Sequence, residues 1–230
     1  MLRLALHLTC AVLAVSTSAP VQAQDPDDEL RIYAAGILNV APFARPFSGY
    51  GVYLGQNAII TAAHVVGHWP ILSDPTVAIA GTEISAKVIK KGSFPQLDLA
   101  LLVAADYALP LNLQLRQNPL CKQTPPVGTS VIVVSPERTE RSLIISPQSI
   151  PARYRSHFGS LINEPHSSGS GIFDAESKCL VGIMSAAVMK DYDFRTAPAR
   201  PYLGLQWDKS AGYFVPVSAI ASFIPGHLRF

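Results

Sequence analysis

Short apolar runs separated by turn residues fill the chain from residue 35 to residue 134. The clearest runs cover residues 51–54, 57–60, 76–80 and 87–89, and none continues with the 3.6-residue period of a helix. Runs of this length and composition favour β-strands. The sequences Gly-Gln-Asn at 55–57 and Gly-Thr-Glu at 81–83 separate neighbouring runs and are typical of tight hairpin turns. The first half of the chain is therefore predicted to consist of short strands joined by hairpins.

The second half repeats this pattern, with candidate strands at 130–134, 143–146 and 180–185. The 19 prolines argue against long helices, because proline breaks the interior of a helix. Only the segment 217–224 is apolar at helical spacing, and it stops at Pro225, which predicts a short C-terminal helix. A polar stretch that contains proline, at 114–126, is the best connection between two β units. We therefore expect an all-β protein with two small β-barrels, one within 24–115 and one within 116–230.

The first 23 residues have the layout of a secretory signal peptide. Arg3 precedes an apolar run from 4 to 15, and Val-Gln-Ala at 21–23 matches the site that a signal peptidase cleaves. The alternative is a membrane anchor, but the apolar run is much shorter than the ~20 residues that a spanning helix needs. We expect cleavage after Ala23, export to the periplasm or out of the cell, and no membrane span in the mature chain. The acidic residues at 25 and 27–29 are then expected to form a solvated N-terminus.

Composition limits the classes of partner. With 49% hydrophobic and 15% charged side chains among 230 residues, the chain has the apolar content of a folded protein. Its net charge of +2 comes without a run of Lys or Arg. Neither nucleic acid nor an anionic membrane surface is therefore an expected partner.

Two cysteines, Cys121 and Cys179, follow the predicted signal peptide. In an exported protein such a pair favours one disulfide, and two buried thiols are the alternative. No CxxC or Cys/His spacing indicates zinc. His64 and His68 are four residues apart, but neither the glutamate of an HExxH motif nor a clear third ligand accompanies them. We expect no metal site and no cofactor.

A histidine and a later carboxylate carry the first chemical signal. His64 comes directly after an apolar strand and two alanines, in the sequence IITAAH at 59–64. Asp98 is the single charge in the sequence LDLALL at 97–102. An ionised carboxylate is costly to bury without a hydrogen-bond donor, and an imidazole N–H supplies one. We therefore expect Asp98 to pair with His64.

A serine on a glycine-rich turn completes the set. The sequence PHSSGSGIFD at 165–174 contains Ser167, Ser168 and Ser170. The segments TAAH (61–64), DLALL (98–102) and SGSGIFD (168–174), in this order, resemble the motifs of chymotrypsin-like serine proteases. The likeness is strongest to bacterial exported members related to HtrA-type proteases and glutamyl endopeptidases, and extends from about residue 49 to the terminal helix. Aligning Phe173 with the family pattern selects Ser168 as the nucleophile.

This resemblance implies a fold of two six-stranded antiparallel β-barrels with a short C-terminal helix. It implies a serine endopeptidase that acts on peptide or protein substrates without a cofactor. We expect the protein to be a monomer. It also suggests that Cys121, on the connection between the barrels, pairs with Cys179, in the hairpin before the strand at 180–185.

The resemblance further implies a role for each site residue. Ser168 would attack a peptide carbonyl to give an acyl-enzyme, His64 would transfer the proton, and Asp98 would orient and stabilise the imidazolium. The backbone N–H groups of His166 and Ser168 would form the oxyanion hole.

Substrate preference is implied by the residues that replace the family's specificity elements. Trypsin-like enzymes carry an aspartate six residues before the nucleophile, and this chain has Ile162 there. Cleavage after Lys or Arg is therefore not expected. The resemblance gives Ile162, Ser185 and Ala187 as substrate-binding residues and predicts an apolar or small side chain at the cleavage site.

Two residues beside the nucleophile depart from the family pattern. His166 stands where the family usually has glycine, which has more conformational freedom. Ser167 stands where zymogen-type members carry an aspartate, so activation by a newly cut N-terminus is not expected. The first departure motivates an alternative from another class, a binding protein that keeps the fold but lacks a working oxyanion hole. Ester hydrolysis by the same three residues is a further alternative.

Overall fold

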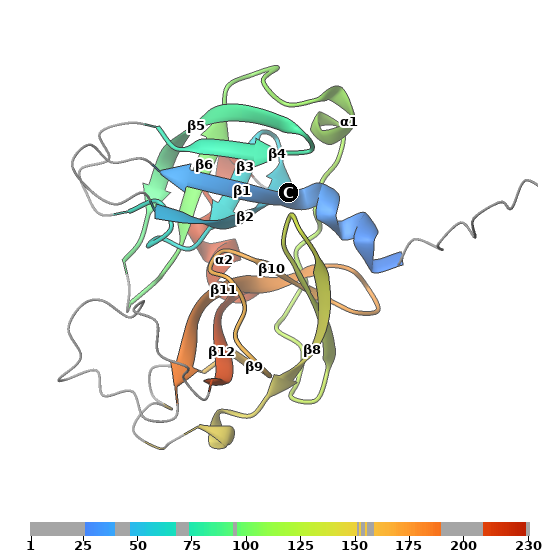
Figure 1. Ribbon diagram of the computed structural model, residues 1–230, viewed down its shortest axis with the longest axis vertical. Helices are drawn as coiled ribbons and strands as arrows, with labels where there is room; N and C mark the ends of the chain where they lie inside the picture. Colours follow the sequence, from blue (N-terminus) through green and yellow to red (C-terminus); the bar gives the residue numbers. More distant parts are fainter. Residues whose placement is uncertain are drawn as a thin grey trace, which may run out of the picture.

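The computed structural model describes residues 26–39, 47–67, 74–93, 96–150, 152, 155, 159–189 and 209–228. These residues form two closed six-stranded antiparallel barrels, one above the other in Figure 1. The predicted fold, all-β with two such barrels and a short C-terminal helix, is confirmed. The predicted signal peptide and its cleavage site at Ala23 lie outside the described residues.

The first barrel closes in the strand order β1-β2-β3-β6-β5-β4. Its strands are β1 (Ala34–Asn39), β2 (Phe47–Gly55), β3 (Ala58–Thr61), β4 (Thr76–Ile79), β5 (Thr82–Lys91) and β6 (Ala100–Ala104). The two predicted hairpin turns join β2 to β3 and β4 to β5, and Asn57 and Gly81 have the positive φ that tight turns need. Apolar side chains from these strands, among them Tyr53, Val77 and Leu102, fill the barrel interior.

The second barrel closes in the strand order β10-β11-β12-β9-β8-β7. Its strands are β7 (Ser130–Val134), β8 (Thr139–Ile145), β9 (Leu161–Ile162), β10 (Gly171–Asp174), β11 (Leu180–Met189) and β12 (Lys209–Pro216). Val131, Ile172 and Phe214 belong to its buried core. The loop between β9 and β10 carries Ser168, the predicted nucleophile, so the second barrel positions this residue.

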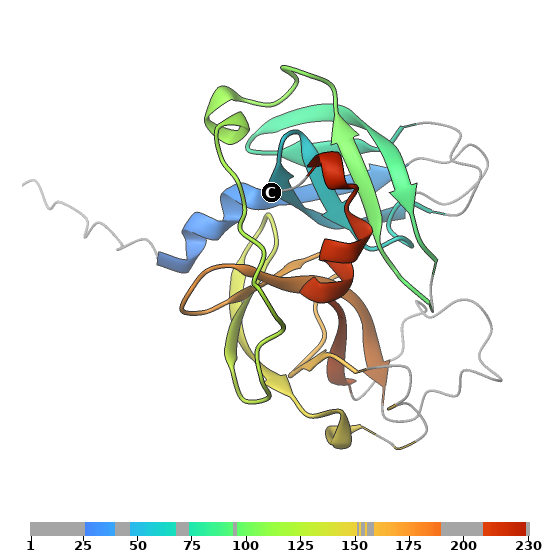
Figure 2. The same cartoon turned by 180° about the vertical axis from the view of Figure 1, so that it is seen from behind.

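The two barrels share an apolar interface. Ile60 of the first barrel belongs to the same buried cluster as Phe173 of the second and Ile220 of α2 (Val217–Phe223). The helix predicted at 217–224 is thus confirmed, and it lies where the barrels meet when the molecule is seen from behind (Figure 2). Lys90 of β5 donates a hydrogen bond of 2.7 Å to the carbonyl of Phe223, which attaches the end of α2 to the first barrel.

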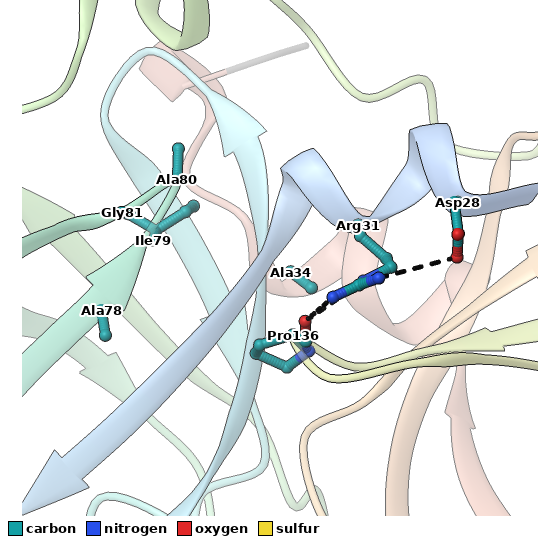
Figure 3. A pocket seen from close by; sticks show the side chains of 8 residues that line it. All are labelled: Asp28, Arg31, Ala34, Ala78, Ile79, Ala80, Gly81 and Pro136. Atoms are coloured by element: carbon teal, nitrogen blue, oxygen red, sulfur yellow. Dashed lines mark hydrogen bonds and ion pairs between the residues drawn. The ribbon is translucent and has the colours of Figure 1, made fainter. Parts of the chain in front are cut away.

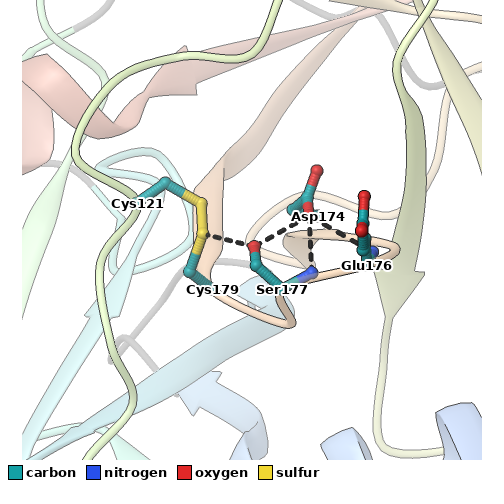
Figure 4. The surroundings of a disulfide bond; sticks show 5 residues. All are labelled: Cys121, Asp174, Glu176, Ser177 and Cys179. Atoms are coloured by element: carbon teal, nitrogen blue, oxygen red, sulfur yellow. Dashed lines mark hydrogen bonds between the residues drawn. A yellow bond between two sulfur atoms is a disulfide. The ribbon is translucent and has the colours of Figure 1, made fainter.

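The connection between the barrels is fastened to the second barrel by a disulfide. It begins with a one-turn helix, α1 (Leu111–Gln114), which is too short to show a helical period in the sequence. Cys121 forms a disulfide with Cys179, which lies in the β10–β11 hairpin (Figure 4). The backbone N–H of Cys121 also donates to the carbonyl of Leu180. A structural disulfide favours a non-cytoplasmic compartment.

The N-terminal segment is a 3₁₀ helix, η1 (Pro26–Tyr33), rather than a solvated tail. Asp27 is only 1% exposed, and its two carboxylate oxygens pair with Lys178 at 2.6 Å and Arg141 at 2.7 Å. The prediction of a solvated acidic N-terminus is therefore wrong at Asp27, while Glu29 is exposed and Asp25 lies outside the described residues. A run of acidic residues looks solvated when its basic partners lie more than 100 positions away in the sequence.

Two further short 3₁₀ helices complete the described elements, η2 (Pro147–Ser149) and η4 (Gly226–Leu228). Within the described ranges, no helix is long and apolar enough to cross a membrane.

Candidate active site

His64 lies in a tight turn directly after β3. The N–H of Val65 donates to the carbonyl of Ala62, and the N–H of Gly67 donates to the carbonyl of His64, so the turn is fixed by its own backbone. Ala62 and Ala63 are buried and small, which lets the turn pack against the barrel wall. The His64 side chain remains 32% exposed, although its Nε2 atom is buried.

Asp98 lies just before β6 and is 2% exposed. Its oxygen Oδ2 lies 2.8 Å from Nδ1 of His64 and accepts a hydrogen bond of 2.6 Å from Oγ of Ser185. Its other oxygen, Oδ1, accepts a hydrogen bond of 3.0 Å from the backbone N–H of His64. The predicted Asp98–His64 pair is therefore present, and it is the burial of the carboxylate that demands these donors.

The charge of Asp98 is stabilised inside the protein. Burial alone would raise the pKa of this carboxyl, but the bonds from His64 and then Ser185 outweigh burial and hold the pKa below its usual range. Nearby Lys91 shows the reverse effect, because burial lowers the pKa of its ammonium group while the charge of Asp98 opposes that shift. Lys91 also donates to the carbonyl of Gly67, at the end of the His64 turn.

Ser168 lies in the loop between β9 and β10, at the boundary of the two barrels. Its carbonyl accepts a hydrogen bond of 2.9 Å from the N–H of Tyr50 in β2, so the first barrel holds this turn directly. Gly169 has φ of +85°, and a Cβ there would lie 1.7 Å from the Tyr50 carbonyl oxygen. The sharp turn behind the serine therefore requires glycine at this position.

Ser185 connects the serine to the carboxylate. Its carbonyl accepts a hydrogen bond of 3.2 Å from Oγ of Ser168, while its own Oγ donates to Asp98. The Nε2 atom of His64 has no hydrogen-bond partner in the described part of the chain. The sequence predicted Ser185 as a substrate-binding residue, and its contact with Asp98 was missed because only the folded strand β11 brings the two together.

His166 lies two residues before Ser168 and does not have a positive φ. The left-handed conformation falls instead on Glu164, with φ of +64°. The His166 side chain is 11% exposed, and its Nδ1 lies 2.9 Å from Oε2 of Glu140 in β8. The backbone N–H groups of His166 and Ser168 donate to no other described residue. No sequence signal linked Glu140 to the loop.

The remaining predicted residues lie on neighbouring strands. Ile162 in β9 is fully buried in the core of the second barrel, and Ala187 in β11 is partly exposed. His68 lies outside the described residues. The described part of the chain contains no group of three or more His, Cys, Asp or Glu side chains arranged to hold a metal.

A separate cavity of about 420 Å³ lies away from these groups (Figure 3). It is lined by residues of η1, β1, β4 and the β4–β5 turn and by Pro136, and none of His64, Asp98 and Ser168 contributes to its wall. Arg31 lines this cavity and donates to the carbonyl of Pro136 at 2.7 Å.

Comparison with known structures agrees with the fold. A protease of Mycobacterium tuberculosis, Rv3671c in its active form, superimposes with a TM-score of 0.60 at 17% identity, over 93% of this chain and 92% of that chain. Kallikrein-related peptidase 10 in complex with Zn²⁺ gives 0.60 at 18% identity, over 86% and 96%. A serine endoprotease of Yersinia pestis gives 0.54 at 18% identity, over 84% of this chain and 61% of that chain.

Sequence comparison identifies the family. No curated protein matches the chain. The family model of the trypsin-like peptidase domain, however, matches residues 49–183, which is more than half of the chain and includes His64, Asp98 and Ser168. The chain therefore belongs to the trypsin-like peptidase family.

Proposed function

We propose that the protein is an exported serine endopeptidase that cleaves peptide bonds through Ser168, His64 and Asp98. The observation that carries this proposal is the Asp98 carboxylate, which is buried and bound to both Nδ1 and the backbone N–H of His64 beside the Ser168 turn. Such a carboxylate fixes the imidazole so that its other nitrogen is free to act as a base. Membership of a peptidase family supports the same reaction class.

In the proposed first step, Oγ of Ser168 attacks the carbonyl carbon of a bound peptide. The hydroxyl proton passes to Nε2 of His64, and the resulting imidazolium is stabilised by the ionised Asp98. His64 then protonates the leaving amine, which departs and leaves an acyl-enzyme. Water attacks the ester carbonyl in the second step and gives its proton to His64. His64 returns that proton to Oγ of Ser168 as the acid leaves.

A small motion of Ser168 precedes this chemistry. Its hydroxyl donates to the carbonyl of Ser185, whereas attack requires a hydrogen bond to Nε2 of His64. Rotation about the Cα–Cβ bond of serine is a motion between staggered rotamers and is fast on the scale of turnover. We propose that substrate binding favours the rotamer in which Ser168 faces His64.

Export is proposed from the first 23 residues and the disulfide. The signal-like sequence would direct the chain out of the cytoplasm, and the Cys121–Cys179 bond suits an oxidising compartment. Mass spectrometry of the protein recovered from its native host tests this point, since a mature N-terminus at Gln24 is expected and an intact Met1 contradicts export by cleavage.

Peptidase activity is tested with a peptide library. The wild-type protein is expected to cleave peptides, with a preference for apolar or small side chains before the cut bond, and Ser168→Ala is expected to remove the cleavage. Ser222→Ala serves as the matched control, because Ser222 is exposed on α2 and donates only within that helix. Cleavage that persists in Ser168→Ala contradicts the assignment of the nucleophile.

Two observations favour a second function. Ser168 donates to Ser185 and not to His64, and His166 replaces the usual glycine of the oxyanion loop, residues 163–168. A protease fold with these features also suits a binding protein that captures peptides without turnover. Saturable peptide binding by a wild-type protein that cleaves no peptide in the library would select this function over the first.

A further inference from the structure

The loop that precedes the nucleophile has few attachments of its own. At its start, the N–H of Asn163 donates to the carbonyl of Leu143, and at its end the N–H of Gly169 donates to the carbonyl of Met184. Between them, no backbone group of residues 164–166 hydrogen-bonds to another described residue. Something other than backbone pairing must hold the middle of this loop in place.

The backbone conformation of Glu164 also requires that the surroundings hold this loop in place. Glu164 takes a left-handed φ of +64°, which costs a non-glycine residue roughly 1 kcal/mol and persists only when the surroundings enforce it. Pro165 follows and has no N–H to donate. The next residue, His166, supplies one of the two proposed oxyanion donors.

The described polar contact that reaches residues 164–166 comes from Glu140. Its Oε2 lies 2.9 Å from Nδ1 of the largely buried His166 side chain, and its Oε1 pairs with Arg138 at 2.9 Å. The two oxygens of Glu140 thus have separate partners, Arg138 and His166. Glu140 also lines a small cavity, together with Val133, Ser135, Arg138, His166, Ser167 and Ser170. Apart from Val133, the residues of this wall are polar.

Strand β8, which carries Glu140, is itself held in place on its other face. Side chains alternate between the two faces of a strand, so Glu140 points to one face while Thr139 and Arg141 point to the other. On that second face, Thr139 donates to Asp28 of η1 at 3.2 Å and Arg141 pairs with the buried Asp27. The N-terminal helix therefore holds β8 from the side opposite the oxyanion loop.

We propose that Glu140 is a positioning residue for the oxyanion hole: its carboxylate fixes the His166 side chain and thereby holds the N–H of His166 beside that of Ser168. This inference rests on the proposed endopeptidase function. The family usually has glycine at this position, whose backbone is flexible. Here the His166 side chain is bound to Glu140 and fixes the backbone, so the histidine is compatible with a functional oxyanion hole.

The hydrogen bond between His166 and Glu140 determines which substitution at position 140 is conservative. Burial lowers the pKa of His166, and the charge of Arg138 acts in the same direction, while Glu140 and Glu164 oppose the shift. The neutral imidazole then donates its Nδ1–H to the carboxylate. A glutamine at position 140 keeps an acceptor oxygen for that bond, whereas an alanine removes it.

The test compares Glu140→Ala and Glu140→Gln with Glu176→Gln, a control in which an exposed carboxylate of the β10–β11 hairpin is neutralised. We expect kcat to fall roughly 10- to 100-fold in Glu140→Ala with KM nearly unchanged, because an oxyanion donor acts mainly in the transition state. Glu140→Gln and the control are expected to stay within about threefold of wild type. In a His166→Gly background, Glu140→Ala is expected to have no further effect.

A second readout is independent of activity. The NMR order parameter of the His166 backbone N–H is expected near ~0.85 in wild type and below ~0.6 in Glu140→Ala. The inference is overturned if Glu140→Ala leaves the order parameter of the His166 N–H unchanged. It is also overturned if Glu140→Ala lowers kcat as much in the His166→Gly background as in the wild-type protein. If the order parameter falls as expected but the wild-type protein cleaves no peptide, the positioning role stands and the endopeptidase proposal fails.

Discussion

At the scale of single residues, the site is organised by one buried carboxylate. Asp98 is almost fully buried, and three hydrogen bonds from His64 and Ser185 compensate for the water it has lost. Each of these bonds stabilises the ionised form of Asp98, so the pKa of the carboxyl lies below its usual range. The imidazole of His64 is thereby held in one orientation with Nε2 directed away from the carboxylate.

Asp98→Asn tests this arrangement. The amide NH₂ cannot accept a bond from Nδ1–H, so the imidazole is expected to change its tautomer or orientation. In serine proteases of this kind the same change lowers kcat on the order of 10⁴-fold with little change in structure, and we expect a loss of that order here. Steady-state kinetics with a peptide substrate measures it, and a loss below tenfold would contradict the role of Asp98.

Gly169→Ala tests the turn behind Ser168. A methyl group there would clash with the Tyr50 carbonyl oxygen, and φ of +85° is unfavourable for alanine. Gly128→Ala is the matched control, because Gly128 has φ of +90° but no atom within 4 Å of the added Cβ. We expect Gly128→Ala to cost about 1 kcal/mol of unfolding free energy and Gly169→Ala at least ~2 kcal/mol more. Equal costs in urea denaturation would show that the close approach to Tyr50 is not required.

At the scale of elements, η1 contacts both barrels and links them. Leu30 enters the apolar cluster shared by both barrels, while Asp27 and Arg31 bind groups of the second barrel. Burial opposes ionisation of Asp27, but Lys178 and then Arg141 more than compensate and lower the pKa of its carboxyl. A depressed pKa stabilises the folded state at neutral pH.

Asp27→Asn should therefore destabilise the protein by about 2 kcal/mol at pH 7, because one buried carboxylate loses two charged partners. The stabilisation by Asp27 is fully present above the ordinary aspartate pKa of ~3.9 and is lost as pH falls through the lower pKa of the folded state. Denaturation of wild type and variant at pH 7 and in acid measures the difference, which is expected to shrink in acid. Glu29→Gln, an exposed neighbour, is the control. A difference that is constant with pH would contradict this account.

Elements with a local signature were predictable from the sequence. Alternating or continuous apolar runs identified β4, β7 and the start of β11, and Gly-containing turns identified two hairpins. α2 was marked by its period and by Pro225. By contrast, Asp27 looked like solvated sequence, since its partners Arg141 and Lys178 become neighbours only when the second barrel closes.

The same distinction applies to the site. The pairing of Asp98 with His64 followed from the cost of burying a lone carboxylate, which is a local argument. The contacts of Ser185 with Asp98 and of Glu140 with His166 join separate strands and loops, and serine and glutamate are common in positions without any such contact. No spacing rule distinguishes these two residues before the fold is known.

At the scale of the whole molecule, two barrels with a shared core bring three distant segments together. The first barrel supplies His64 and Asp98, the second supplies Ser168, and the disulfide ties the connection between them to the β10–β11 hairpin. It closes a loop of 58 residues, and the loss of chain entropy in the unfolded state is worth about 4 kcal/mol for a loop of that size.

Replacing both cysteines, as in Cys121→Ser with Cys179→Ser, is therefore expected to lower the unfolding free energy by about 2–4 kcal/mol and the Tm by roughly 10 °C. Peptidase activity at low temperature is expected to remain, because Cys121 and Cys179 do not touch the site residues. Calorimetry and a peptide assay on the same sample measure both effects. An unchanged Tm would show that the disulfide does not stabilise the folded chain.

Covalent labelling by a fluorophosphonate tests whether Ser168 is an activated nucleophile, because this reagent reacts with a serine only when a base activates the hydroxyl. We expect a single adduct, mapped by mass spectrometry to Ser168 and not to Ser167 or Ser170, and absent from the His64→Ala variant. Labelling at Ser168 with this dependence on His64 supports the proposed serine, histidine and aspartate mechanism. A folded wild-type protein that stays unlabelled while a control protease reacts would contradict it.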